Sequence, residues 1–183
     1  MIPLERSETV AFVWPDSKSV PDEVDSPVAI TEFVLDRTAF EHVQAAIGWQ
    51  VTDNQWDQLM QELVPGSMVF VKDDSGEPMA TACACATKNK WTELAWVAVA
   101  ENHRGKRLGK VVCIALVKKL LGTGTKHIFG STQDERLMAL RVYLEMGFFP
   151  VYRKEKVSRW RDICDRLDHP YTPRMWGWPA GLA

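Results

Sequence analysis

The middle of the chain reads Val97-Ala98-Val99-Ala100-Glu101-Asn102-His103-Arg104-Gly105-Lys106-Arg107-Leu108-Gly109-Lys110. An apolar strand leads into a short cationic turn that contains glycine, and an apolar helix follows at once. Such a turn presents backbone N–H groups at the start of a helix, among positive side chains. The arrangement favours binding of a phosphate or pyrophosphate group.

The turn fits neither of the common nucleotide-binding motifs. A P-loop spaces its glycines more widely and carries Ser or Thr after its lysine. Here three residues separate Gly105 from Gly109, and Val111 follows Lys110. The later segment 122–124, Gly-Thr-Gly, leads into a strand and not a helix, so it is not a dinucleotide-binding fingerprint.

The composition is that of an ordinary globular domain. The 183 residues are 46% hydrophobic and 25% charged, which is enough for one domain with a full core. The net charge of −2 gives no electrostatic reason to expect nucleic acid or a membrane as a partner. The N-terminus has no signal pattern, and the apolar runs, such as 111–117, are too short to span a bilayer. We therefore expect a cytoplasmic protein.

The cysteines and histidines are spaced like neither a disulfide framework nor a metal site. Cys83 and Cys85 point to the same face of an expected strand. Cys113 lies within an apolar helix, where packing is a more common role than nucleophilic attack. We expect Cys83 and Cys85 to be reduced and partly buried, and we expect no bound metal.

The expected order of elements is β-α-α-β-β-β-α-β-α-β followed by an extension, which is typical of an α/β domain with a mixed sheet. Residues 1–27 are expected to form an N-terminal arm or edge strand (with 9–14 as that strand), 28–156 the main domain and 157–183 a C-terminal extension. The expected strands are 28–34, 68–72, 79–87, 91–100, 126–131 and 148–154, and the expected helices are 36–48, 53–64, 111–121, 134–146 and 158–167. Asp36 is the expected N-cap of the first helix, and Thr52 or Asp53 is that of the second.

The cationic turn resembles the acyl-coenzyme A loop of the GNAT superfamily of N-acetyltransferases, whose pattern is Arg/Gln-x-x-Gly-x-Gly/Ala. Arg104 and Gly109 match the outer positions, and Arg107 stands where the pattern has its inner glycine. A positive φ at Arg107 would cost roughly 1 kcal/mol or more. We expect a helical φ there, because Gly105 supplies the flexibility. The resemblance implies that the cofactor is bound by Arg104, Gly105, Lys106, Arg107, Leu108, Gly109 and Lys110.

A second match follows on the next expected helix, in Ala139-x-x-x-Tyr143-x-x-x-Gly147-Phe148. The resemblance implies that Tyr143 protonates the departing coenzyme A thiolate. Tyr143 flanks the apolar stripe of that helix, and a plain core-edge tyrosine is the alternative. The resemblance also implies cofactor contacts from Thr132 and from Arg136, which stands where many relatives have Asn.

The strand 93–99 is similar to the central strand of the family. By alternation, Glu93, Ala95, Val97 and Val99 are expected to share one face. The resemblance implies that backbone groups of Val97, Ala98 and Val99 hold the acyl carbonyl and the pantetheine arm. It also implies that Glu93 takes the proton of the amine, directly or through water. The alternative for Glu93 is a solvated carboxylate near the lysines that precede the strand.

These resemblances imply the GNAT fold, a mixed and mostly antiparallel sheet flanked by helices, with a C-terminal helical extension. They imply transfer of an acetyl group from acetyl-CoA to a primary amine of a small-molecule acceptor, with a homodimer left open. Trp49 and Trp56 are expected to wall the acceptor pocket. Asp53, Asp57 and Glu62 on the same helical segment would suit a cationic or aromatic amine.

Three other readings of the sequence stay open. The donor could be a longer acyl-CoA, which the sequence does not distinguish from acetyl-CoA. The chain could be a non-catalytic, regulatory acyl-CoA-binding module, which Arg107 and Arg136 favour because both depart from the family pattern. It could also be an α/β interaction domain whose cationic turn binds nothing.

Overall fold

The computed structural model describes residues 9–15, 19–21, 30–151 and 157–172. Within them the chain order is strand β1, strand β2, helices α1 and α2, strands β3, β4 and β5, a short 3-10 helix, helix α3, strand β6, helix α4, strand β7 and helix α5. Their bounds are β1 Thr9–Val13, β2 Ile30–Phe33, α1 Arg37–Ala45, α2 Asp53–Glu62, β3 Val69–Lys72, β4 Pro78–Ala86, β5 Thr92–Val99, the 3-10 helix Glu101–His103, α3 Leu108–Gly122, β6 Ile128–Gln133, α4 Leu137–Met146, β7 Phe149–Pro150 and α5 Val157–Leu167.

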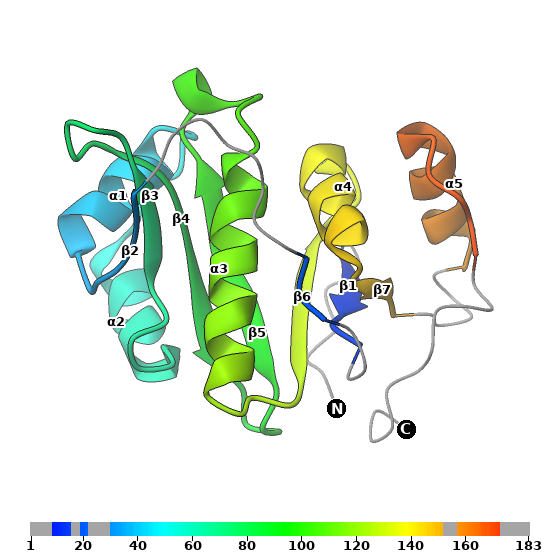
Figure 1. The fold of residues 1–183 in the computed structure, drawn as a ribbon, viewed down its shortest axis with the longest axis horizontal. Helices are drawn as coiled ribbons and strands as arrows, with labels where there is room; N and C mark the ends of the chain where they lie inside the picture. The colour runs from blue at the N-terminus through cyan, green and yellow to red at the C-terminus, as the bar shows by residue number, and fades with distance from the viewer. Residues whose placement is uncertain (1–8, 16–18, 22–29, 152–156, 173–183) are drawn as a thin grey trace.

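The described strands form one sheet in the order β2-β3-β4-β5-β6-β1-β7. Among these strands β5 and β6 are the one parallel pair, and every other neighbouring pair is antiparallel. Helices α3 and α4 cover one face of the sheet, while α1 and α2 cover the other, and α5 packs beside α4 (Figure 1). This is the mixed, mostly antiparallel sheet flanked by helices that the sequence predicts.

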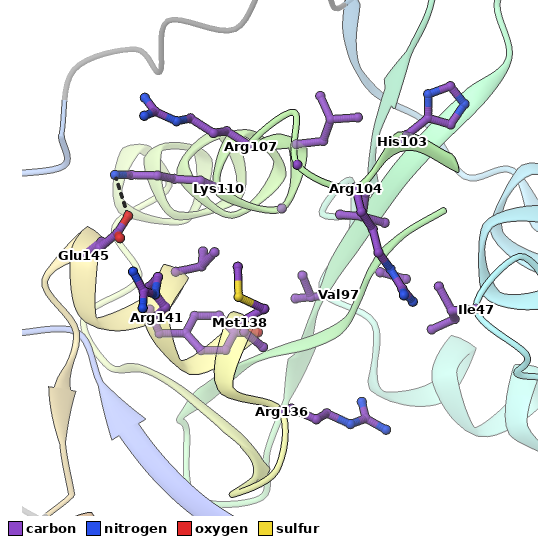
Figure 2. Close-up of a pocket in the computed structure, with 18 of the residues that line it drawn as sticks. Ile47, Val97, His103, Arg104, Arg107, Lys110, Arg136, Met138, Arg141 and Glu145 are labelled. Carbon is purple, nitrogen blue, oxygen red and sulfur yellow. Dashed lines mark ion pairs between the residues drawn. The ribbon is translucent and has the colours of Figure 1, made fainter. Parts of the chain in front are cut away.

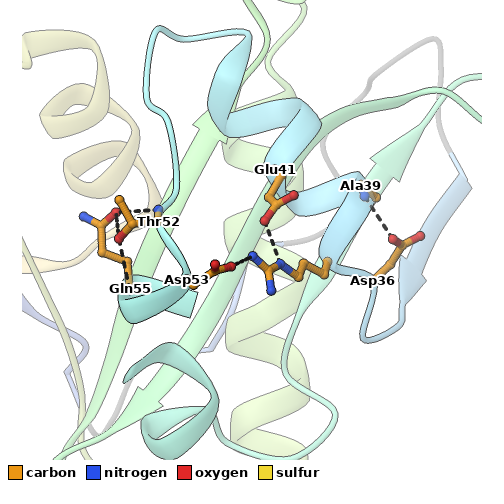
Figure 3. Close-up of polar contacts among 7 residues, drawn as sticks. Asp36, Ala39, Glu41, Thr52, Asp53 and Gln55 are labelled. Carbon is orange, nitrogen blue, oxygen red and sulfur yellow. Dashed lines mark hydrogen bonds and ion pairs between the residues drawn. The ribbon is translucent and has the colours of Figure 1, made fainter. Parts of the chain in front are cut away.

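The local signals for the first two helices act as predicted (Figure 3). The side chain of Asp36 accepts a hydrogen bond of 2.9 Å from the N–H of Ala39, which caps α1. Thr52 and Gln55 form a reciprocal capping box at the start of α2. Arg37 pairs with Glu41 on its own helix and with Asp53 at the start of α2, so it ties the two helices together.

Strand β1 is not an edge strand, contrary to the expectation for Thr9–Trp14. It lies between β6 and β7. Val10 and Phe12 face the core under α3 and α4, whereas Ala11 and Val13 belong to a second cluster on the opposite face. A strand buried on both faces needs a continuous apolar run, and residues 10–14 provide one. Residues 1–8, 16–18, 22–29, 152–156 and 173–183 lie outside the described part of the chain. The expected boundaries of the N-terminal arm, the main domain and the C-terminal extension therefore stay predictions.

A β-bulge at Trp96 interrupts the alternation of β5. The register with β4 shifts between Thr81 and Cys83, and Trp96 has a positive φ of 55°. As a result Ala95 and Trp96 both pack with the core under α1 and α2. Leu94, Val97 and Val99 pack with the core under α3. The expectation that Glu93, Ala95, Val97 and Val99 share one face is therefore wrong, because it assumed an unbroken strand.

The parallel pair β5–β6 is short, and the two strands then separate. Pairing covers Thr92 to Leu94 on β5 and Ile128 to Gly130 on β6. Beyond this point β5 continues alongside β4 through Val99, and β6 continues alongside β1 through Gln133. The sheet thus splays open between β5 and β6, at the end where the cationic turn leaves β5.

Gly130 is needed at the point where the strands separate. A Cβ atom built there would lie 2.4 Å from Cε2 of Phe12, whose ring stacks on that of Tyr143 at a centroid distance of 4.0 Å. We predict that Gly130→Ala lowers the free energy of unfolding by about 1–3 kcal/mol, because the ring has no room to move in a close-packed core. Urea denaturation with a far-UV circular dichroism readout measures this change.

Gly122→Ala is the matched control. Gly122 has no atom within 4 Å of a built Cβ and no positive φ, and it ends α3. Its replacement is expected to leave stability unchanged or raise it by up to about 1 kcal/mol. Equal urea midpoints for the two variants would contradict a steric role for Gly130.

Candidate functional site

The cationic turn lies at the N-terminus of α3. After the 3-10 helix the chain turns through Gly105 and Arg107, whose φ values are 81° and 60°, and α3 begins at Leu108. Leu108 is buried and anchors this end of the helix in the core. The first N–H groups of a helix have no partner within it and carry its positive dipole end. The structure thus places the cationic turn at a helix N-terminus, and anion binding there stays a prediction.

A cavity of about 660 Å³ opens at the splay between β5 and β6. Its walls come from the end of β5, the cationic turn, the first turn of α3, one face of α4 and the loop after α1 (Figure 2). The lining residues are Ile47, Trp49, Val97, Ala98, Val99, His103, Arg104, Gly105, Arg107, Leu108, Gly109, Lys110, Arg136, Met138, Ala139, Arg141, Val142, Tyr143 and Glu145.

The cavity brings together most of the predicted site residues. It is lined by the predicted end of β5 (Val97 to Val99), by six of the seven turn residues, and by Arg136, Tyr143 and Trp49. Four predicted residues lie elsewhere, and each has another environment. Lys106 is exposed and contacts the His103 ring, Thr132 pairs with Val10 of β1, Trp56 is buried under α1, and Glu93 accepts a hydrogen bond from Ser131.

One face of α4 contributes lining residues that the sequence analysis missed. Met138, Arg141, Val142 and Glu145 follow the spacing i, i+3, i+4, i+7, which places them on one side of the helix. Met138 is 73% exposed although it is large and apolar. In the sequence these residues form a second stripe beside the apolar, core-facing stripe that Tyr143 flanks.

Tyr143 is held as a neutral phenol at the inner end of the cavity. Its ring is stacked against Phe12 and lies edge-on to Phe148 at a centroid distance of 5.9 Å. Burial raises the pKa of Tyr143 well above its ordinary value, and the nearby Cys113 and Glu93 raise it further, while Arg136 lowers it. The hydroxyl group is therefore a proton donor at neutral pH.

Glu93 lies at the origin of the splay and does not line the cavity. Its Oε1 accepts a hydrogen bond of 2.9 Å from the Ser131 hydroxyl, across the gap between β5 and β6. Leu94 packs into the core under α3, so Glu93 points toward the side of α1 and α2. Its charge nevertheless acts on Tyr143 from there. A carboxylate and a phenol thus lie on the two sides of one opening.

Buried Gln44 of α1 is a further residue that the sequence did not indicate. Its Nε2 donates a hydrogen bond of 3.1 Å to the carbonyl of Trp96 in the bulge. The backbone carbonyl of Gln44 accepts hydrogen bonds of 3.2 and 3.0 Å from the backbone N–H groups of Ile47 and Trp49. Gln44 therefore fixes the bulged strand and the loop that forms the opposite wall of the cavity.

Three further features of the described residues concern the thiols, the possible metal ligands and the lengths of the helices. The cysteines are free and buried, and burial alone raises the pKa of Cys113 to about 12, so this thiol stays protonated at neutral pH. Among the described residues no cluster of His, Cys, Asp and Glu is suited to hold a metal ion. No helix in the described part of the chain is long and apolar enough to cross a bilayer.

Arg107 has a left-handed backbone, with φ 60° and ψ 13°, and not the helical one that we expected. The turn enters α3 through this residue, and Gly105 does not relieve it because Gly105 has a positive φ of its own. An L-residue in this region costs roughly 1 kcal/mol or more. Arg107 thus adds a positive charge at the helix N-terminus at some cost in stability.

We predict that Arg107→Gly is more stable than Arg107→Ala by about 1 kcal/mol, because both lose the guanidinium but only glycine tolerates this φ freely. Urea midpoints of the two variants provide the test. An alanine variant at least as stable as the glycine variant would show that the residue does not adopt the left-handed conformation in solution.

Comparison with known proteins identifies the family. Residues 35–148 match the model of the acetyltransferase (GNAT) family. A GCN5-related N-acetyltransferase from Sphaerobacter thermophilus superposes with a TM-score of 0.66 at 16% identity, over 78% of this chain and 48% of that one. The GCN5-related N-acetyltransferase from Kribbella flavida gives 0.54 at 22% identity, over 80% and 55% of the two chains.

A shorter structure also matches. The ribosomal-protein-S18-alanine N-acetyltransferase from Escherichia coli superposes with a TM-score of 0.55 at 14% identity, over 65% of this chain and 76% of that one. At these identities the likeness concerns the fold. No curated protein sequence matches the chain. The chain spans about half the length of the first two structures, 48% and 55%. The family match covers residues 35–148, most of the chain, and so this protein belongs to the acetyltransferase (GNAT) family.

Proposed function

We propose that the protein transfers an acetyl group from acetyl-CoA to a primary amine of a small-molecule acceptor. The observation that carries this proposal is the placement of three features on one opening of the sheet. These are the cationic turn before α3, the end of β5 that none of the described strands pairs with on the side of β6, and the buried phenol of Tyr143. Membership of the family supports the same chemistry.

The turn and the unpaired strand would bind the donor. The N–H groups of Gly105 to Gly109 would donate hydrogen bonds to the pyrophosphate, whereas the N–H of Arg104 already donates to the Glu101 carbonyl. Arg107 or Lys110 would reach the 3′-phosphate. Lys106 is a weaker candidate for that contact, since it does not line the cavity. None of the described strands pairs with Val97 to Val99 on the side of β6, so their backbone groups would be available to the pantetheine arm and the acyl carbonyl.

The reaction would be a direct attack. The amine nitrogen bonds to the carbonyl carbon of the thioester, and the carbon–sulfur bond then breaks. Tyr143 gives its proton to the leaving sulfur, and Glu93 accepts the proton released by the amine, directly or through water. The positions of the two groups on opposite sides of the splay suit this division, since acceptor and donor approach from different faces. No residue forms a covalent intermediate in this scheme.

Titration of the protein with acetyl-CoA in a calorimeter tests the donor site. We expect saturable binding whose Kd rises severalfold between about 0.1 and 1 M salt, because the Debye length falls from about 10 to 3 Å. Absence of binding at a ligand concentration on the order of 1 mM would overturn the proposal. Competition between acetyl-CoA and longer acyl-CoA donors then determines which donor the cavity prefers.

Tyr143→Phe tests the chemistry. We expect kcat to fall about a hundredfold or more, with acetyl-CoA affinity retained, because the ring stays stacked and only the proton donor is lost.

Since burial raises the pKa of the phenol, Tyr143 stays protonated to higher pH than an exposed tyrosine. The kcat of the wild type should therefore show no alkaline loss from this group below about pH 10.

Tyr171→Phe is the control for that substitution. Tyr171 lies outside the cavity, where its ring packs beneath Arg161 at 5.5 Å. This variant should keep the kcat of the wild type, measured by release of the free thiol of coenzyme A. A Tyr143→Phe variant with the kcat of the wild type would remove Tyr143 from the mechanism. Binding without turnover in the wild type would identify a non-catalytic acyl-CoA-binding module.

A further inference from the structure

The cations around the cavity fall into two groups. Arg107, Lys110 and Arg141 lie on the side of α3 and α4, while the guanidinium groups of Arg104 and Arg136 lie toward Ile47 (Figure 2). Ile47 belongs to the loop after α1, across the splay from α4. The first group lies at the helix N-terminus where the phosphates of the donor would bind. The second group lies on the side that the acceptor would occupy.

Arg104 and Arg136 are weakly compensated within the protein. Arg104 forms an ion pair of 3.1 Å with Glu101, but both side chains are more than half exposed, so the pair is weak. Arg136 donates a hydrogen bond of 3.1 Å to the neutral amide oxygen of Gln133. By contrast Lys110 faces the carboxylate of Glu145 at 3.5 Å, and Glu145 is the one carboxylate among the residues that line the cavity in the described chain.

The carboxylates that the sequence suggested for a cationic acceptor do not line the cavity. Asp53 pairs with Arg37, and Asp57 and Glu62 lie on exposed positions of α2. Besides Arg104 and Arg136, the acceptor side is formed by the apolar and aromatic side chains of Ile47 and Trp49. Trp49 lines the cavity, is 42% exposed, and meets Trp96 edge-on at 6.2 Å.

We propose that the acceptor is a primary amine that also carries a carboxylate, as in an amino acid, and that Arg136 and Arg104 bind this carboxylate. Guanidinium groups match a carboxylate in shape and charge. Trp49 would cover the apolar body of such an acceptor. The electrostatic effect of Arg136 on Tyr143 supports a location near the reacting atoms. The inference rests on the proposed acetyl transfer and names its acceptor.

Matched acceptors that differ in the carboxylate alone provide the test. Acetylation of L-phenylalanine is compared with that of phenethylamine, and L-tryptophan with tryptamine, by release of coenzyme A thiol and by mass spectrometry of the product. We expect kcat/KM to favour the carboxylate-bearing member of each pair by about tenfold or more. Arg136→Gln should reduce this ratio about tenfold, and Arg136→Lys should retain part of it.

Lys110→Gln is the matched control, since it removes one cation from the donor side of the same cavity. It should weaken acetyl-CoA binding and leave the acceptor ratio as in the wild type. Equal use of both members of each pair would overturn the proposal. An Arg136→Gln variant that changes acetyl-CoA affinity without changing the ratio would also overturn it, as would a wild type that acetylates none of the carboxylate-bearing amines.

Failure of the donor site gives a different result. A protein that does not bind acetyl-CoA in the calorimeter contradicts the proposed function itself. A protein that binds acetyl-CoA and acetylates only amines without a carboxylate contradicts the acceptor assignment and leaves the acetyl transfer standing.

Discussion

The hydrogen bond from Gln44 to the carbonyl of Trp96 is the interaction on which the site depends. A parallel pair such as β5–β6 would ordinarily continue to the strand ends and leave no opening. The bulge at Trp96 turns the end of β5 so that its backbone is no longer paired with β6. A bulge leaves a carbonyl without its ladder partner, and a buried carbonyl needs another donor. Gln44 supplies that donor from α1.

Strand β1 gives the domain a support that lies outside the family match at residues 35–148. Its insertion between β6 and β7 brings the ring of Phe12 over Gly130 and onto Tyr143. Phe12 covers one face of the Tyr143 ring, and Tyr143 also lines the cavity. The N-terminal strand therefore helps to fix the ring of Tyr143, although the motifs that resemble the family are on other elements. Deletion of residues 1–14 would therefore remove Phe12 from its stack on Tyr143, whereas deletion of residues 1–8 would leave Phe12 in the chain.

The sequence predicted those features whose signals are local. The caps at Asp36 and Thr52, the helix after the turn and the helix that carries Tyr143 depend on neighbouring residues, and the structure confirms them. The bulge at Trp96 could not be predicted, because it depends on pairing with β4 and on a side chain of α1. The interior place of β1 depends equally on distant strands, although its unbroken apolar run was a usable sign. The conformation of Arg107 is decided by how the turn joins two fixed elements.

The uneven charge of the cavity bears on how an amine reacts there. The protein as a whole carries a net charge of −2, yet the described residues of the cavity wall include five cationic Arg and Lys side chains and one carboxylate. Nearby positive charges lower the pKa of an amine, since they disfavour its ammonium form. In the proposed reaction, the cations of the cavity would therefore favour the neutral, nucleophilic form of the acceptor. This would lessen the demand on Glu93, whose position at the origin of the splay suits removal of the proton after attack.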